Sequence, residues 1–197
     1  MGSISVTMFM TLDGVVQAPG RPDEDTRGGF THGGWGQPYN DEVLGREMGQ
    51  AMGRPGDMLF GHRTWDDFRT AWGRATHDNP FSTYMNAATK YVVSRGDVDV
   101  DAWQHSILLR GDAVETVGRL KAESDRELGI IGSVSLVQSL HAARLIDRYT
   151  LVFSAAARHR HPAVRGDGAH DGARADRQRA DRKGRDHRAL RPPLTRR

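Results

Sequence analysis

The order of hydrophobic and polar positions predicts a chain in which strands and helices alternate. Residues 4–10 alternate with a period of two, which is typical of a strand. Short apolar runs at 58–60, 90–95, 106–109, 128–132 and 150–153 predict five more strands. Apolar residues spaced three or four apart predict helices at 41–52, 112–121 and 133–143, with a further helix beginning near residue 64. We therefore expect an α/β three-layer sandwich, with a mostly parallel sheet flanked by helices.

Residues 17–38 interrupt this alternation with a long segment rich in Gly, Pro, Asp and Arg. Loops of this length in compact domains often bind ligands or cover a site. On that interpretation, the aromatic side chains of Phe30 and Trp35 are candidate substrate-binding residues. The alternative is an insertion whose aromatic residues cover the edge of the core.

The segment around Gly132 has the pattern of a strand, a glycine turn and a helix start. Gly132 ends an apolar run, and Ser133 occupies the expected N-cap position before an amphipathic segment. Such a junction presents free backbone N–H groups and the positive end of a helix dipole, which suit a phosphate. A second junction of this kind follows residues 58–60, where Thr64 and Asp67 also predict a capping box.

Two charged residues that follow predicted strands are candidates for ligand binding or catalysis. Arg95 comes at the end of residues 90–95, where an arginine can meet the ribose 2′-phosphate of NADP. The alternative for Arg95 is a solvated side chain at a strand end. Asp13 comes directly after the first strand, although Asp-Gly is also a common turn sequence.

Four segments together resemble the dihydrofolate-reductase-like superfamily. They are Thr-Leu-Asp-Gly at 11–14, Leu-Phe-Gly-His-Arg-Thr-Trp at 59–65, Tyr-Val-Val-Ser-Arg at 91–95 and Ile-Gly-Ser-Val-Ser-Leu at 131–136. The order and spacing are most similar to the stand-alone relatives of the C-terminal reductase domain of the bifunctional riboflavin-biosynthesis deaminase/reductase. The resemblance covers about residues 3–154.

The resemblance implies an NADPH-dependent reductase that acts on a small-molecule substrate. It implies cofactor-binding roles for Gly61, His62, Arg63, Thr64, Ser94, Arg95, Gly132, Ser133, Val134 and Ser135. It places Asp13 on the substrate side, where it is the candidate catalytic residue. Close relatives are often dimers, so the resemblance also admits a homodimer.

The sequence departs from dihydrofolate reductases proper in two ways. Ile131 precedes Gly132 where those enzymes have a pair of glycines, and the first helix offers no clear counterpart of their folate-binding carboxylate. We therefore expect the substrate to be a small heterocycle or a carbonyl or imine compound, reduced by hydride transfer, rather than folate.

Composition narrows the class of protein further. The chain of 197 residues has no cysteine, which excludes disulfides and thiolate metal sites, and we expect no metal. It has no apolar run of about 18 residues, so we expect no membrane span. Its first residues lack a secretory pattern, so we expect a cytoplasmic protein.

Residues 156–197 differ sharply from the rest of the chain. They contain 13 Lys and Arg against 5 Asp and Glu, and no Ile, Met, Phe, Trp or Tyr. Such a segment cannot bury enough apolar surface to fold alone. We therefore divide the chain into a reductase domain at 1–155 and a basic low-complexity tail at 156–197, which we expect to be disordered.

The tail has the composition of GC-rich coding DNA translated in a wrong frame, and we interpret it as a possible frameshift product. On this hypothesis a C-terminal edge hairpin is missing and strand 150–153 becomes an edge. Two other functions stay open: a non-catalytic NADP(H)-binding protein with a damaged C-terminus, and a nucleic-acid binder that uses its basic tail. The tail has no aromatic residues to stack on bases, so we do not expect nucleic acid as a partner.

Overall fold

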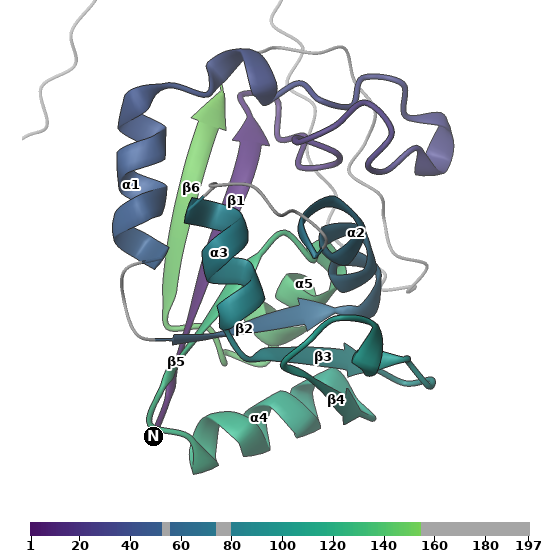
Figure 1. Ribbon diagram of the computed structural model, residues 1–197, viewed down its shortest axis with the longest axis vertical. Helices are drawn as coiled ribbons and strands as arrows, with labels where there is room; N and C mark the ends of the chain where they lie inside the picture. Colours follow the sequence, from purple (N-terminus) through teal and green to yellow (C-terminus); the bar gives the residue numbers. More distant parts are fainter. Residues whose placement is uncertain (53–55, 74–79, 155–197) are drawn as a thin grey trace, which may run out of the picture. The chain divides into compact units, whose positions relative to one another are not determined.

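The computed structural model describes residues 1–52, 56–73 and 80–154 and shows a parallel six-stranded sheet between two layers of helices (Figure 1). The strands are β1 (Ser3–Thr11), β2 (Gly56–Gly61), β3 (Lys90–Ser94), β4 (Ser106–Arg110), β5 (Glu127–Ile131) and β6 (Arg148–Ser154). The helices are α1 (Glu42–Met52), α2 (His62–Trp72), α3 (Pro80–Ala87), α4 (Ala113–Glu123) and α5 (Val134–Ala142), with short 3₁₀ turns at Arg27–Gly29, Gln37–Tyr39 and Val100–Ala102. The predicted α/β sandwich is confirmed.

The strand order is β4-β3-β2-β5-β1-β6, and every neighbouring pair is parallel. The carboxyl ends of all six strands therefore lie at the same end of the sheet, which is where α/β proteins usually bind ligands. β2 and β5 are adjacent, so the two junctions that the sequence singled out become neighbours. β6 is at one edge of the sheet within the described residues.

Each face of the sheet has its own apolar core. On one face, Val117 of α4 and Leu136 and Leu140 of α5 pack against Val6 and Leu128. On the other face, large side chains from α2, α3, the sheet and the end of the 3₁₀ turn at Val100–Ala102 fill the space: Met58, Phe60, Trp65, Met85, Val92 and Trp103. Along β1, Ile4, Val6 and Met8 point to the face covered by α4 and α5 and are buried, whereas the residues between them point to the other face and are half-buried.

The long segment after β1 is folded on a small core of its own. Val15, Ala18, Phe30 and Trp35 are buried together, and Phe9 of β1 packs against them. The Trp35 indole donates a hydrogen bond to the carbonyl oxygen of Gln17 at 2.7 Å. Arg21 pairs with Asp67, which attaches the segment to α2.

Several sequence predictions concern residues 155–197, which lie outside the described residues. These are the boundary of the reductase domain, the disordered tail, the missing edge hairpin and the frameshift. They stay predictions. The predicted capping box is wrong, because α2 begins at His62, so Thr64 lies inside the first turn and Asp67 pairs with Arg21 instead.

Candidate nucleotide-binding site

The two glycine junctions are in direct contact. The Gly61 N–H donates a hydrogen bond to the Ser133 hydroxyl at 3.0 Å, across 72 positions of sequence. A Cβ atom placed on Gly132 would lie 3.6 Å from the Thr64 methyl group. The β2–α2 turn and the β5–α5 turn therefore form one continuous backbone surface. Ser133 occupies the predicted N-cap position, but its hydroxyl makes no cap to α5 and holds the neighbouring turn instead.

The amino-terminal ends of α2 and α5 have no side-chain cap and no acidic residue in the first turn. Their first N–H groups and the positive ends of their dipoles are therefore available to an anion. Helix α4 shows the contrast, since Asp112 accepts hydrogen bonds from the N–H groups of Val114 and Glu115. Of the helices that directly follow strands β2, β4 and β5, α2 and α5 thus have starts that suit phosphate, and the start of α4 is occupied by a carboxylate.

The backbone at the second junction is left-handed at two successive residues. Gly132 has φ +73° and Ser133 has φ +55°. Glycine adopts this region at little cost, whereas a β-branched residue at 132 would be strained. The strain would come from the backbone, because the nearest atom to an added Cβ is at an ordinary contact distance.

Two exposed basic residues begin α2. His62 and Arg63 lie in its first turn, and within the described residues Arg63 makes no ion pair. A guanidinium beside a helix start adds a full charge and bidentate donors to the partial charge of the dipole. This is the position that the sequence resemblance assigned to pyrophosphate binding.

A second basic cluster lies where β3 and β4 end. Arg95 follows Ser94 and pairs with Asp112 at 3.4 Å, while its side chain is 87% exposed. Arg110 is in register with Ser94 on the neighbouring strand and pairs with Asp97 at 2.7 Å. The sequence analysis did not select Arg110. A signal was available, because both strands end in Arg-Gly, at 95–96 and at 110–111.

Asp13 is held at the end of β1 by a buried hydroxyl. The Thr11 side chain is fully buried, donates to the Asp13 carboxylate at 2.5 Å and accepts from the Val15 N–H at 2.9 Å. The Asp13 side chain is exposed. A turn with these bonds gives the carboxylate a defined position beyond the strand end.

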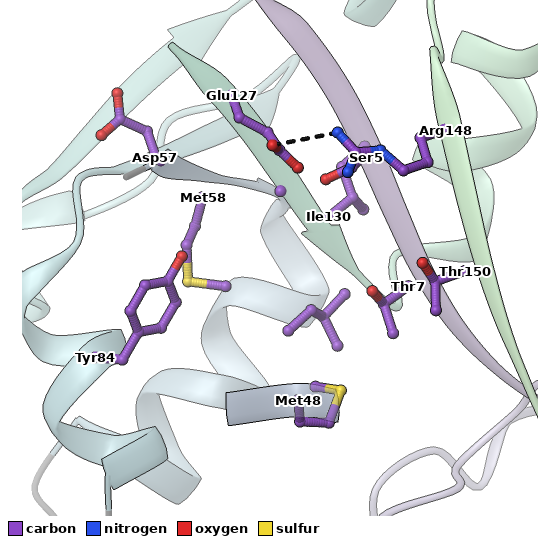
Figure 2. Close-up of a pocket in the computed structure, with 13 residues that line it drawn as sticks. Ser5, Thr7, Met48, Asp57, Met58, Tyr84, Glu127, Ile130, Arg148 and Thr150 are labelled. Atoms are coloured by element: carbon purple, nitrogen blue, oxygen red, sulfur yellow. Dashed lines mark hydrogen bonds and ion pairs between the residues drawn. The ribbon is translucent and has the colours of Figure 1, made fainter. Parts of the chain in front are cut away.

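A pocket lies against the sheet face that carries α1 and α3 (Figure 2). Hydroxyl groups of Thr7, Thr150 and Tyr84 line it together with the apolar side chains of Met48 and Ile131. Ile131 immediately precedes Gly132, so the pocket begins where the second glycine junction ends. The sequence analysis named none of these residues as substrate-binding, because polar positions such as Thr7 are also ordinary in an alternating strand.

Charged groups surround the inner part of the pocket. Glu127 pairs with Arg148 at 3.3 Å, and buried Asp57 pairs with Arg126 at 2.9 Å. Burial raises the pKa of Tyr84, and the carboxylates of Asp57 and Glu127 raise it further. The Tyr84 phenol is therefore a neutral hydrogen-bond donor at physiological pH.

Phe30 and Trp35 are both buried in the core of the loop. The side chains serve the folding of this segment, which agrees with the alternative that the aromatic residues cover the edge of the main core. A contact between either side chain and a substrate stays a prediction.

The structure is that of an α/β protein with two uncapped helix starts and exposed arginines at the carboxyl ends of its strands. Comparison with known families identifies the family. The RibD C-terminal domain family matches residues 3–157, and the chain belongs to it. The resemblance found in the sequence is thereby confirmed. Comparison with curated protein sequences gives no match.

Two solved structures are similar over most of the chain. One is a protein from Shewanella sp. PV-4 described as a riboflavin biosynthesis protein, with 18% identity, a TM-score of 0.49, and coverage of 77% of this chain and 76% of that one. The other is dihydrofolate reductase from Enterococcus faecalis complexed with NADP(H) and RAB-propyl, with 12% identity, a TM-score of 0.47, and coverage of 78% and 72%. Both TM-scores are below 0.5, so membership of the family rests on the match over residues 3–157.

No helix within the described residues is long and apolar enough to span a membrane.

Proposed function

We propose that this protein is an NADPH-dependent reductase that transfers a hydride to a small heterocyclic or carbonyl or imine substrate. The observation that carries the proposal is the contact between the two uncapped helix starts, made by the Gly61 N–H and the Ser133 hydroxyl. Two free helix N-termini on one backbone surface suit the two adjacent phosphates of a dinucleotide. Membership of the RibD C-terminal domain family supports a reductase.

Different residues at the strand ends bind different parts of the cofactor. Gly61, His62, Arg63 and Thr64 line one side of the pyrophosphate, and Gly132, Ser133, Val134 and Ser135 line the other. The donors are the first N–H groups of α2 and α5, since the Gly61 and Gly132 N–H groups already bond Ser133 and Thr7. Ser94 and Arg95 hold the ribose 2′-phosphate, and Arg110 supplies a second cation beside Ser94. The ion pairs of Arg95 and Arg110 are exposed, so exchanging them for a phosphate costs little.

The substrate lies in the pocket beside Ile131. NADPH supplies the hydride when it is bound, and the protein orients the acceptor and provides a proton. The hydroxyls of Thr7, Thr150 and Tyr84 hydrogen-bond polar atoms of the substrate, while Met48 and Ile131 contact its apolar surface. Asp13, oriented by Thr11, passes a proton directly or through a water molecule.

The first test is a fluorescence titration of the full chain with NADPH and with NADH. We expect NADPH to bind more tightly, and we expect Arg95→Ala to weaken NADPH binding about tenfold while leaving NADH unchanged. Arg119→Ala is the matched control, because Arg119 is an exposed arginine on α4 that pairs with Glu115. If neither NADPH nor NADH binds, the proposal is overturned.

Turnover is tested with NADPH and a panel of small heterocycles, aldehydes, ketones and imines. For an accepted substrate, we expect Asp13→Asn to lower kcat by about 100-fold or more with NADPH affinity unchanged, because asparagine keeps the turn but carries no transferable proton. Asp125→Asn, an exposed carboxyl at the opposite end of the sheet, is the control. NADPH binding without oxidation of any substrate in the panel would identify a non-catalytic NADP(H)-binding protein.

A further inference from the structure

Gly129 is a glycine in the interior of strand β5 that the packing of the chain does not require. Its φ is not positive, so other residues can adopt its backbone conformation. In the part of the chain that the structure describes, a Cβ atom placed on Gly129 would meet a single atom, the Asp57 carbonyl oxygen, at the ordinary contact distance of 3.8 Å. Glycine weakens a strand interior and often marks a place where a ligand approaches the backbone.

Gly56 on the neighbouring strand β2 shows the contrast. A Cβ atom placed on Gly56 would lie 3.0 Å from the Glu127 carbonyl oxygen, which is closer than ordinary contact. The approach of β2 to β5 therefore accounts for Gly56. Both glycines line the pocket, but no crowding of this kind acts at Gly129.

A side chain at position 129 would project into the pocket. Leu128 and Ile130 belong to the core under α4 and α5, so Gly129 points to the opposite face of the sheet, which carries α1 and α3. Its partners in register are Ser5 on β1 and Met58 on β2, and both also line the pocket. The missing side chain therefore leaves a hollow in the sheet between Ser5 and Met58.

Four hydroxyl groups around this hollow are available to a ligand. Figure 2 shows Ser5, Thr7 and Thr150 on the strands and Tyr84 on the helix side of the pocket. Among residues 1–52, 56–73 and 80–154, none of these hydroxyls has a hydrogen-bond partner. Their side chains are half-buried or exposed, so water satisfies them now and a ligand can replace it.

The pocket continues past Gly129 to a polar end. Ile131 lies beside the second glycine junction, and Glu127 lies four residues away on the same strand, at a distance of about 13 Å. Glu127 pairs with Arg148 at 3.3 Å, and both side chains are partly exposed. A polar group of a ligand can therefore exchange into this ion pair at small cost.

We propose that Gly129 is a specificity-determining residue and that the substrate is an elongated molecule. This inference rests on the proposed reductase function. The group that accepts the hydride lies beside Ile131, the middle of the substrate crosses the hollow at Gly129, and a polar end group meets Glu127 and Arg148. A side chain at position 129 would block the middle part, so the glycine selects for length.

The first experiment measures access to the hollow and does not depend on turnover. The chain has no cysteine, so Ser5→Cys places a single thiol beside Gly129. We expect methyl and benzyl methanethiosulfonate both to label this thiol. Adding Gly129→Val should slow the benzyl reagent by about tenfold and the methyl reagent by less than about twofold, because valine fills the space that a ring needs.

Gly118→Val in α4 is the matched control for Gly129→Val. Gly118 is also half-buried, and a Cβ atom placed on it would meet one atom, Leu145 Cδ1 at 3.9 Å. Labelling of Ser5→Cys by both reagents should not change with Gly118→Val. Equal slowing of the two reagents by Gly129→Val, or no slowing of either, overturns the proposal.

The second experiment compares two aldehydes that share a reacting group, benzaldehyde and the longer 4′-hydroxybiphenyl-4-carbaldehyde. With NADPH, we expect the parent protein to have a KM about tenfold lower for the longer aldehyde, and we expect Gly129→Val to bring the two KM values together. NADPH affinity should not change, because Gly129 lies outside both glycine junctions. A KM difference that survives Gly129→Val overturns the proposal.

Protection of the thiol separates this inference from the proposed function. With NADP⁺ present, the longer aldehyde should slow labelling of Ser5→Cys by the methyl reagent, and benzaldehyde should not, whether or not either aldehyde is reduced. Protection without reduction would leave Gly129 as a determinant of binding and overturn the reductase function. Absence of protection by the longer aldehyde overturns the inference about Gly129 and leaves NADPH binding and turnover to be judged by their own tests.

Discussion

The two ends of the sheet use charged residues in opposite ways. At the amino-terminal end, Lys90 is fully buried and donates to the carbonyl oxygens of Met85 and Ala88. Lys121 pairs with Asp147 at 2.6 Å at the same end. At the carboxyl-terminal end, Arg63, Arg95 and Arg110 are exposed, and the two helix starts that contact each other have no cap.

The charged residues named at the amino-terminal end therefore contribute to stability, whereas those named at the carboxyl-terminal end are available to a ligand. Lys90, Lys121 and Asp147 are consumed in holding elements together, so they have little capacity left for a ligand. Polar groups at the carboxyl-terminal end are exposed or weakly paired, and a ligand can satisfy them at small cost. Variants at the first end should change unfolding, and variants at the second should change nucleotide affinity.

The largest effect on affinity is expected from Gly132→Val. A β-branched residue at φ +73° forces the turn out of its left-handed conformation, so the α5 helix start no longer faces the phosphates. We expect NADPH and NADH to lose affinity alike, by about 100-fold, because both carry the pyrophosphate. The measurement is the fluorescence titration described above.

Gly29→Val is the matched control for this variant. Gly29 also has a positive φ, of +75°, but lies in the loop with no atom near an added Cβ. Comparable strain there should leave nucleotide affinity unchanged. Equal losses in both variants would show that general destabilisation, rather than the junction, explains the effect.

At the other end of the sheet, Lys90 should make stability depend on pH. Burial lowers the pKa of Lys90 to about 8 from its ordinary value of 10.5. Below pH 8 the amine is charged in both states, and the folded state carries the cost of burying it. Between pH 8 and 10.5 the unfolded state binds more protons, so the free energy of unfolding rises with pH, by roughly 2 kcal/mol at pH 9.5.

Lys90→Met isolates this contribution. Other groups titrate in the same range, among them Tyr84 and Tyr91, whose pKa values are raised by burial. The unfolding free energy of the parent protein minus that of Lys90→Met should rise with pH above 8, as measured by chemical denaturation. A difference that does not vary with pH would show that the amine is not buried in its charged form.

The smallest effect is expected at Arg110. Arg110→Ala should weaken NADPH binding by about threefold, because this arginine is one of two cations beside Ser94 and is exposed. NADH affinity should not change, since NADH lacks the 2′-phosphate. The loss should shrink in high salt, which screens exposed charges. An equal loss of affinity for NADH would show that Arg110 does not act through the 2′-phosphate.

Much of the fold could be predicted from local sequence patterns. The six strands and the helix capped by Asp112 follow from the spacing of apolar residues and from capping preferences, which act within a few residues of chain. The start of α2 was predicted two residues late, because a Thr and Asp three apart resemble a capping box. Asp67 instead bonds Arg21, a partner 46 residues away that no local pattern reveals.

The sequence by itself determined the class of fold, the two glycine junctions and the basic residues that follow the strands. The tertiary structure alone decided that the junctions touch through Gly61 and Ser133, that Arg110 lies beside Ser94, and that Phe30 and Trp35 are buried. The physical reason is the range of the interactions. Propensity and periodicity are local, whereas strand order and register depend on long-range packing that brings distant residues together.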